Sequence, residues 1–410
     1  MRHVHFIGIG GVGMNGLAQL AALSNYSVSG SDRAYDPSAE LFQALEKLGI
    51  PIFSQDGSGV SEKTRQVVYS TAIESDNPDL VKARELNIPL LHRAEFLKEL
   101  IGGDELIAVA GTAGKTTTTG LLGWIFESLG EDPSVYNGAA VLNWKTHGQP
   151  GNVRKGNSDL WIIEADESDK SFLNFRPTHS IITNISKDHY ELDELHAMFD
   201  QFEGQTSGTT VKDHKPCPDL KVPMLGKHNQ ENAICAMELC AELGMDMAQV
   251  REAVASFKGI ERRLEIAGEA GGVTVIDDYA HNPAKIGAAL SAVEEAYGSV
   301  HAFWRPHGFT PLFQCQKDLI RVFKQARPRS LFILPVYYAG GTVARKTTSA
   351  EFVDKLNSAG VPAVLVPDYA ALKRELEQCA ESGDAILGMG ARDPELPLFA
   401  KRLVAGWKMS

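Results

Sequence analysis

The stretch AVAGTAGKTTTTGLLGWIF, Ala108–Phe126, carries the strongest fold signal in the chain. An apolar run of strand type, Leu106–Ala110, leads into the glycine-containing turn Gly111–Thr116, and an apolar run of helical length follows. A strand that enters a helix through G-x-x-G-K-T is typical of a loop whose backbone N–H groups hold nucleotide phosphates. The usual phosphate-loop pattern has a further glycine five places before Gly114, where this chain has Val109. The stretch therefore predicts an α/β nucleotide-binding domain, but it specifies neither the nucleotide nor the reaction.

The residues of this phosphate loop have distinct expected roles. The ammonium group of Lys115 would reach the terminal phosphates as a point charge, and the hydroxyl group of Thr116 would bind Mg²⁺. Backbone N–H groups supply the rest of the cradle, so the size of the side chains matters little there. The residues predicted to bind ATP are Gly111, Thr112, Ala113, Gly114, Lys115, Thr116 and Thr117.

A second glycine loop lies near the N-terminus, where a strand-like run ends in GIGGVG and an apolar helical run follows. Its glycines permit a tight turn and a close approach of a pyrophosphate to the helix N-terminus. Asp32 ends the next strand, where a carboxylate would accept ribose hydroxyl groups. A dinucleotide and a nucleotide-sugar diphosphate are both open, with a purely structural turn as the alternative. The residues assigned to this site are Gly8, Gly10, Gly11, Gly13 and Asp32.

Strand-like and helix-like runs alternate along most of the 410 residues. This alternation predicts the α/β class, with parallel sheets and covering helices. Changes of pattern near IGGDEL and FKGIERRLEIAGEAGG predict three domains, with boundaries 1–103, 104–260 and 261–410. One segment, Glu203–Met224, is polar and lacks periodicity. It predicts a loop of about twenty residues, which is unusual in a compact domain.

The composition narrows the class of protein. The net charge of −12 argues against broad binding of nucleic acid or of an anionic membrane. No run of 18 apolar residues predicts a membrane-spanning helix. The five cysteines are scattered without a C-x-x-C pair, which favours reduced thiols in a cytoplasm over a disulfide framework. The N-terminus has no signal-peptide pattern, so we expect a soluble cytoplasmic enzyme.

Eight motifs in a fixed order give the chain a family resemblance. They are GIGGVGMNGLA, VVYSTAIESDNPDL, GTAGKTTTTG, IIEADESDKSFL, IITNISKDH, GKHNQENA, GIERRLE and DDYAHNPAKI. In this set the chain resembles the Mur ligases, which add amino acids to peptidoglycan precursors. The GIGG start, EADESD and the RR-x-E pattern are most similar to the branch that adds L-alanine to UDP-N-acetylmuramate. A sister branch that recycles murein peptides onto the same sugar nucleotide, and a non-catalytic relative of the same fold, are the alternatives.

The resemblance implies an architecture and a reaction. A Rossmann-like N-terminal domain would hold the UDP-sugar, with Ser70 of the VVYSTAI motif among its ligands, and a phosphate-loop central domain would hold ATP and Mg²⁺. A Rossmann-like C-terminal domain would hold the incoming amino acid. ATP would phosphorylate the lactyl carboxylate of the sugar, and the amine would then attack the acyl-phosphate. The protein would act in the cytoplasm as a monomer or homodimer, without nucleic acid or membrane.

The resemblance also implies the metal ligands. Glu164 and His189 would bind Mg²⁺ beside Thr116. Taken alone, His189 is equally well read as a structural or acid–base histidine, since histidine is an uncommon ligand of Mg²⁺. The acidic segment Asp166–Asp169 that follows Glu164 reads, by itself, as a solvated loop. The implied catalytic residues are Lys115, Glu164, His189 and Arg263.

Further ATP contacts are implied around the boundary of the central and C-terminal domains. By resemblance, Asn229 and Asn232 would face the adenine, with a role as helix caps as the alternative for two asparagines near a helix start. Arg262 and Arg263 follow the last central helix, and one of them would reach the γ-phosphate. An exposed arginine pair is the alternative. Asp278 would close over the nucleotide.

The amine site shows a departure from the family pattern. The residues implied there are Tyr279, His281, Arg305 and His307. Relatives carry arginines for the amino-acid carboxylate where this chain has Gly308 and Pro311, and neither residue can replace a guanidinium group. Arg305 and Arg345 are the candidates for compensation.

The central domain departs from the pattern as well. Glu203–Met224 is shorter than the corresponding stretch of relatives, which holds several strands. We therefore expect one flank of the ATP-binding sheet to be bare, and an exposed sheet edge favours dimerisation or instability.

Overall fold

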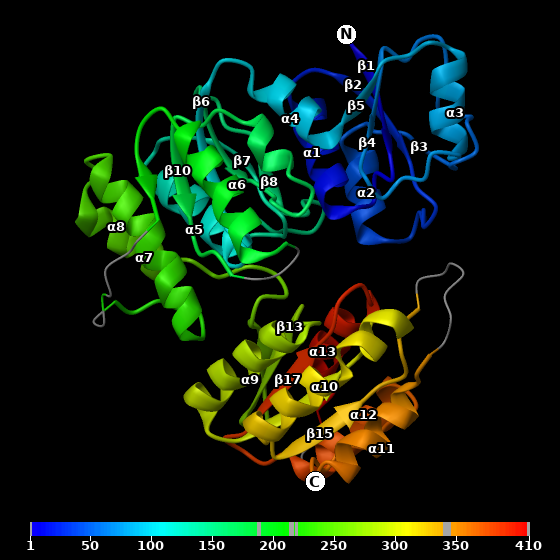
Figure 1. Cartoon of the computed structure of the whole chain (residues 1–410), viewed down its shortest axis with the longest axis vertical. Helices are drawn as coiled ribbons and strands as arrows, with labels where there is room; N and C mark the ends of the chain where they lie inside the picture. The colour runs from blue at the N-terminus through cyan, green and yellow to red at the C-terminus, as the bar shows by residue number, and fades with distance from the viewer. Residues whose placement is uncertain (1, 187–189, 213–216, 218–219, 339–345, 408–410) are drawn as a thin grey trace. The chain divides into compact units, whose positions relative to one another are not determined.

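The computed structural model describes residues 2–186, 190–212, 217, 220–338 and 346–407. The chain forms two compact units, Met1–Pro223 with His228–Ile260, and Met224–Lys227 with Glu261–Ser410. Strands and helices alternate in both units, and the described strands form three sheets (Figure 1). The predicted α/β class is therefore confirmed. One sheet lies in each predicted range, 1–103, 104–260 and 261–410, while the boundaries themselves stay a prediction.

The first sheet is parallel, with the strand order β3-β2-β1-β4-β5. Its strands are β1 (His3–Ile7), β2 (Ser27–Ser31), β3 (Ile52–Phe53), β4 (Gln66–Tyr69) and β5 (Leu90–His92). Its helices are α1 (Val12–Leu23), α2 (Glu40–Lys47), α3 (Pro78–Glu85) and α4 (Arg93–Ile101). The strand order reverses at β1, and a ligand of an open α/β sheet binds at such a switch point. The first glycine loop follows β1 directly, so it lies at this position.

The second sheet has the order β11-β10-β6-β9-β7-β8, and β8 is antiparallel to β7. Its strands are β6 (Glu105–Ala110), β7 (Ser134–Tyr136), β8 (Val153–Arg154), β9 (Leu160–Glu164), β10 (His179–Ile182) and β11 (Thr210–Val211). Its helices are α5 (Lys115–Ser128), the 3-10 turn η1 (Ser171–Asn174), α6 (Leu192–Gly204), α7 (Lys227–Glu242) and α8 (Met247–Ala255). The phosphate loop connects the central strand β6 to α5, as the sequence predicts.

The prediction of a plain loop over 203–224 is partly wrong. Helix α6 continues to Gly204, and β11 pairs in parallel with β10 through Ser180 and Thr210. The side-chain hydroxyls of Ser180 and Thr210 lie 2.9 Å apart, which adds a cross-strand hydrogen bond. A two-residue strand is too short to show hydrophobic alternation, so periodicity could not predict β11.

The third sheet has the order β12-β13-β17-β14-β15-β16. Its strands are β12 (Glu265–Ala270), β13 (Val273–Asp278), β14 (Val300–Trp304), β15 (Ser330–Ile333), β16 (Val364–Leu365) and β17 (Ala385–Met389). Its helices are α9 (Pro283–Tyr297), α10 (Phe309–Ala326), α11 (Ser349–Ser358), α12 (Tyr369–Cys379) and α13 (Glu395–Ala405). Only β12 runs antiparallel, with a bulge between Ile266 and Gly268. Helices α9, α10 and α11 share one buried cluster with the sheet, and α12 and α13 share another.

The sheets share an apolar core in the first unit and have mostly short edge strands. In the first unit a single apolar core continues from the first sheet, around Phe6 and Phe96, to the second, around Trp161 and Phe199. Within the described residues, five of the six sheet edges are strands of two or three residues: β3, β5, β8, β11 and β16. None of the helices formed by these residues is long and apolar enough to cross a membrane.

Candidate active site

The conformation of the phosphate loop is fixed by its two glycines and by hydrogen bonds to the segment after β10. Gly111 and Gly114 have φ values of 134° and 86°, in the range that favours glycine. The backbone N–H of Thr112 donates to the carbonyl of Asn184 at 3.0 Å, and the Thr112 hydroxyl donates to the Asn184 side chain at 2.7 Å. The helix α5 then starts with Lys115, so its unpaired N–H groups face the loop. This is the geometry of an anion-binding helix N-terminus.

Lys115 lies inside this loop and is held by two acceptors. Its Nζ is 2.7 Å from the carbonyl oxygen of Gly111 and 2.5 Å from Oε2 of Glu167. Glu167 is 2% exposed, so the reading of its acidic segment as a solvated loop is wrong for this residue. Burial raises the pKa of Glu167, and the neighbouring Lys115 ammonium opposes that rise. The ion pair holds the Lys115 ammonium beside the loop, where phosphate oxygens would compete with Glu167 for it.

Two of the three predicted metal ligands lie together. Oε1 of Glu164 accepts the hydroxyl proton of Thr116 at 3.0 Å, and Oε2 accepts the N–H of Gly138 at 2.7 Å. A carboxylate and a hydroxyl are the hard oxygen ligands that suit Mg²⁺. His189 lies outside the described residues. Among the residues that are described, no three histidine, cysteine or acidic side chains form a metal-binding group.

An arginine that the sequence did not single out binds the acidic segment Asp166–Asp169 to helix α4. Nη2 of Arg93, the first residue of α4, donates to Asp166 at 3.1 Å and to Asp169 at 2.9 Å. The hydroxyl of Tyr136 donates to the carbonyl of Gly13 at 3.1 Å, in the first glycine loop. The acidic segment therefore turns Glu167 towards the ATP loop and its two aspartates towards the N-terminal sheet. A lone arginine in HRAEF gives no sequence signal for this role.

The first glycine loop is closed by Asp32. Its Oδ2 accepts the backbone N–H of Gly10 at 2.7 Å, and its Oδ1 accepts that of Ala34 at 2.8 Å. Gly8, with φ 73°, and Gly11 form the turn before α1, and Gly13 lies in the first turn of that helix. Asp32 thus has a structural task in addition to the ribose contact predicted for it.

Ser70 lies directly after β4, the strand next to β1. The carboxyl ends of neighbouring parallel strands share one edge of a sheet, so Ser70 lies on the same edge as the first glycine loop. This arrangement is compatible with the ligand role predicted for Ser70.

The two asparagines of α7 pack against the phosphate loop. Asn229 and Asn232 are 2% and 5% exposed, and Asn232 Nδ2 donates to Asn229 Oδ1 at 3.3 Å. A side chain at Gly114 would collide with the Asn232 amide. Because α7 begins at Lys227, neither asparagine is its N-cap, and the capping alternative is wrong. Their buried amides lie beside the loop predicted to bind ATP.

In the second unit, Arg262 is bound within the fold. Its Nε donates to Asp277 at 3.0 Å, its Nη2 donates to the Gly390 carbonyl at 2.5 Å, and its guanidinium lies 5.1 Å from the Tyr279 ring centre. Arg263 lies 5.6 Å from the same ring. An exposed pair is therefore the wrong description of Arg262.

Asp278 is equally committed, because its carboxylate accepts backbone N–H groups from two neighbouring turns. One oxygen accepts the N–H of Leu264 and the other that of Ala280, each at 2.7 Å. Asp278 is buried. Its carboxylate therefore fixes the turn that carries Tyr279 and His281.

The predicted amine residues meet at the carboxyl edge of the third sheet. The rings of His281 and His307 are 5.0 Å apart and nearly perpendicular, and Tyr279 lies 5.6 Å from His281. Nδ1 of His281 lies 3.0 Å from the Tyr279 carbonyl, which only accepts, so Nδ1 donates and Nε2 keeps its lone pair. Burial lowers the pKa of His281 to about 4, so its imidazole is neutral at pH 7.

Arg305 is not available in the way the sequence suggested. Its Nη1 donates to Asp393 at 2.6 Å, and its guanidinium lies about 5.5 Å from the ring centres of Tyr337 and Tyr369. Arg345 lies outside the described residues. The N–H of Gly308 donates to the Tyr337 carbonyl at 2.9 Å, so this glycine closes a turn.

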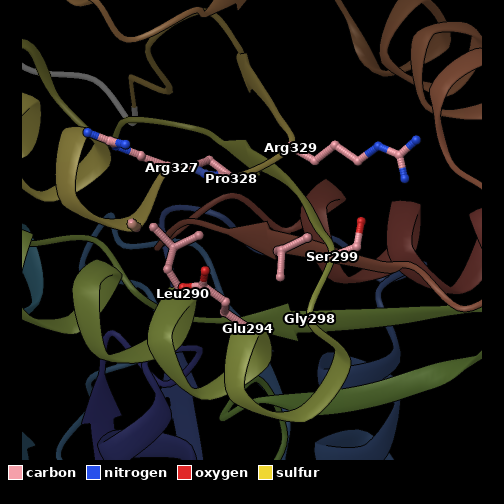
Figure 2. A pocket seen from close by; sticks show the side chains of 9 residues that line it. Leu290, Glu294, Gly298, Ser299, Arg327, Pro328 and Arg329 are labelled. Carbon is pink, nitrogen blue, oxygen red and sulfur yellow. The ribbon is translucent and has the colours of Figure 1, made fainter.

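A pocket of about 200 Å³ opens at the opposite edge of the third sheet (Figure 2). It lies between the end of α9, with Leu290 and Glu294, and Arg327 and Pro328 after α10, beside the starts of β14 and β15. Ligands of open α/β sheets bind at the carboxyl ends of the strands, so this pocket lies away from the candidate site.

Three family profiles match the chain. "Mur ligase family, catalytic domain" matches residues 3–104, "Mur ligase middle domain" matches 109–203, and "Mur ligase, glutamate ligase domain" matches 262–392. One profile falls on each of the three sheets. The three-domain architecture of that family is therefore present in this chain.

Individual relatives cover almost the whole chain. A UDP-N-acetylmuramate–L-alanine ligase of Phenylobacterium zucineum is 33% identical over 95% of this chain and 92% of its own. The ligase of the same name from Maricaulis maris is 33% identical, with 97% and 96% covered. The crystal structure of UDP-N-acetylmuramate–alanine ligase from Thermotoga maritima gives a TM-score of 0.83 at 26% identity, over 99% of both chains. A murein peptide ligase from Psychrobacter arcticus gives 0.69 at 22% identity over 99% and 98%, which is a likeness of fold alone.

Proposed function

This chain belongs to the Mur ligase family, and on that premise we propose that it joins L-alanine to the lactyl carboxylate of UDP-N-acetylmuramate, with ATP as the energy source. The observation that carries the proposal is the phosphate loop, where Lys115, Thr116 and Glu164 lie together as phosphoryl transfer to a carboxylate requires. Relatives of this name at 33% identity support the choice of substrates.

The reaction has two steps. An oxygen of the lactyl carboxylate attacks the γ-phosphorus of ATP, and ADP leaves with the electrons of the broken P–O bond. The alanine amine, after losing a proton, then attacks the acyl carbon, and the tetrahedral intermediate collapses to the amide and inorganic phosphate. The neutral imidazole of His281 suits a place beside that amine, because its Nε2 can accept a proton.

Charge neutralisation is the main task of the residues at the phosphate loop. Lys115 is paired with Glu167, and the γ-phosphate of ATP would take over this ammonium group. Thr116 and Glu164, with His189, would hold Mg²⁺, which supplies further positive charge to the phosphates. Asn229 and Asn232 would border the adenine, as their burial beside the loop suggests.

One observation favours an amine substrate other than L-alanine as a second candidate. Gly308 and Pro311 stand where relatives carry arginines, so the site could serve a murein peptide or another amino acid by the same chemistry. Release of ADP from UDP-N-acetylmuramate, ATP and Mg²⁺ should be measured with L-alanine, with other single amino acids and with a murein tripeptide. We expect release with L-alanine. Turnover with the tripeptide but not with alanine would select the second candidate, and no turnover with any amine would refute both.

Lys115→Ala is the matching variant for this assay, and Lys98→Ala, at an exposed residue of α4, is its control. Only Lys115→Ala should abolish ADP release. Equal activity of both variants would mean that this loop does not serve ATP turnover.

We propose the cytoplasm as the site of action, since all five cysteines are free and suit a reducing compartment. A monomer or homodimer is the proposed assembly, and sedimentation velocity would distinguish the two.

A further inference from the structure

The amine site needs a cation that nothing so far supplies. An α-amino acid brings a carboxylate next to its amine, and proteins recognise such a group best with an arginine. Gly308 and Pro311 carry no charge, and Arg305 is already paired with Asp393. Another guanidinium group at the same edge of the third sheet would meet the need.

The turn after β17 brings an arginine to this edge. Strand β17 lies between β13 and β14, so its carboxyl end lies between the turns that carry His281 and His307. Two backbone hydrogen bonds fix the place of this turn. The N–H of Gly390 donates to the Asp278 carbonyl at 3.2 Å, and the N–H of Arg305 donates to the Met389 carbonyl at 3.0 Å.

Arg392 is the exposed residue of this turn, and its backbone is strained. Its φ is 64°, a left-handed conformation that an arginine adopts only at a cost. Its neighbours Ala391 and Asp393 are buried, whereas Arg392 is exposed. Within the described residues, its guanidinium has no hydrogen bond or ion pair. It is close enough to His307 to act on its charge, because burial and then the positive charge of Arg392 lower the pKa of His307.

We propose that Arg392 binds the carboxylate of the incoming amino acid and thereby sets the specificity for the amine. This inference rests on the ligation proposed above and adds a residue to it. The forked guanidinium would hold both carboxylate oxygens, while the amine lies towards His281 and His307. A substrate without a carboxylate beside its amine would lose this contact, so L-alaninamide should be a poor substrate.

The chain offers a well-matched pair of variants for the test. Arg392→Gly removes the guanidinium and relieves the left-handed strain, so the variant should fold at least as stably as the native protein. Arg327→Gly makes the same change at a second exposed, left-handed arginine, φ 46°, at the opposite edge of the sheet. Arg392→Lys keeps a charge but loses the fork.

The measurement is the KM for each substrate by ADP release. Arg392→Gly should raise the KM for L-alanine about 30- to 1,000-fold, because an ionic hydrogen-bonded pair is lost, and leave the KM values for ATP and UDP-N-acetylmuramate within about twofold. Arg392→Lys should raise the KM for L-alanine about tenfold. The preference for L-alanine over L-alaninamide should disappear in Arg392→Gly, and Arg327→Gly should behave as the native protein.

The outcomes separate this inference from the proposed function. If the native protein releases no ADP with any amine, the ligation itself is refuted. If it uses L-alanine and Arg392→Gly keeps the native KM for L-alanine, only the role of Arg392 is refuted. A variant that raises all three KM values together would also refute it, because a folding defect and not a lost carboxylate contact would explain that result.

Discussion

Substitution of Gly114 by alanine should disable the phosphate loop, because two separate penalties meet at this position. The φ of 86° puts an alanine in the left-handed region, which costs about 1–2 kcal/mol. The new methyl group would also overlap the side-chain amide of Asn232, and overpacking of this kind costs about 1–3 kcal/mol. We expect Gly114→Ala to lower the free energy of unfolding by about 2–5 kcal/mol.

A control at Gly130 isolates the second penalty. Gly130 follows α5 with a φ of 88°, and no atom lies within 4 Å of the position that its Cβ would take. Gly130→Ala should therefore cost only the backbone term of about 1–2 kcal/mol. In an Asn232→Ala background, Gly114→Ala should cost this smaller amount as well, which gives a coupling energy of about 1–3 kcal/mol between the two positions.

The assay is urea unfolding followed by circular dichroism, using the transition that a non-hydrolysable ATP analogue shifts. Calorimetric titration with the same analogue gives its affinity, which should fall in Gly114→Ala and not in Gly130→Ala. Equal destabilisation by the two glycine variants, or strict additivity of Gly114→Ala with Asn232→Ala, would refute the contact on which the reasoning depends.

Three further predictions concern titration, a buried ion pair and the metal. The pKa of His281 is about 4 in the folded protein, below its unfolded value of about 6.5. This group therefore contributes about 3 kcal/mol to the free energy of unfolding above pH 6.5, and the contribution is lost as the pH falls to 4. His281→Gln should flatten the change of the urea midpoint over this pH range. Arg262→Ala leaves Asp277 buried without its partner and should cost about 3–5 kcal/mol in urea unfolding, with partial recovery in the double variant Arg262→Ala with Asp277→Asn. Glu164→Gln should raise the Mg²⁺ concentration needed for half-maximal ADP release by at least about tenfold, and an unchanged Mg²⁺ dependence would exclude Glu164 as a ligand.

The motifs that depend on local sequence could be predicted from it. The order strand, glycine turn, helix is written within about twenty residues at Ala108–Phe126, and the structure builds β6, the phosphate loop and α5 there. That motif needs only the periodicity of side chains and the glycine turn between them. The grouping of Thr116 with Glu164 was implied by the family resemblance, and the structure places it at the ends of the neighbouring strands β6 and β9.

Features that depend on distant partners could not be predicted. The burial of Glu167 follows from Lys115, which is 52 residues away, and the role of Arg93 follows from aspartates more than 70 residues away. A sequence shows that Asp166–Asp169 is acidic, but not which cations the fold places opposite it. Asp32 was assigned to a ligand, whereas its two oxygens also close the glycine loop, because backbone donors do not appear in a residue pattern.

The short edge strands of the sheets limit edge-to-edge pairing between copies of the chain. A neighbouring molecule extends a sheet by pairing with a row of unsatisfied N–H and C=O groups, and a strand of two residues offers very few. The flank at β11 ends in such a strand, and β12, the one long edge, is interrupted by a bulge at Ile266. The shortening predicted around Glu203–Met224 would therefore leave a two-residue edge strand, β11, and not a long template for aggregation.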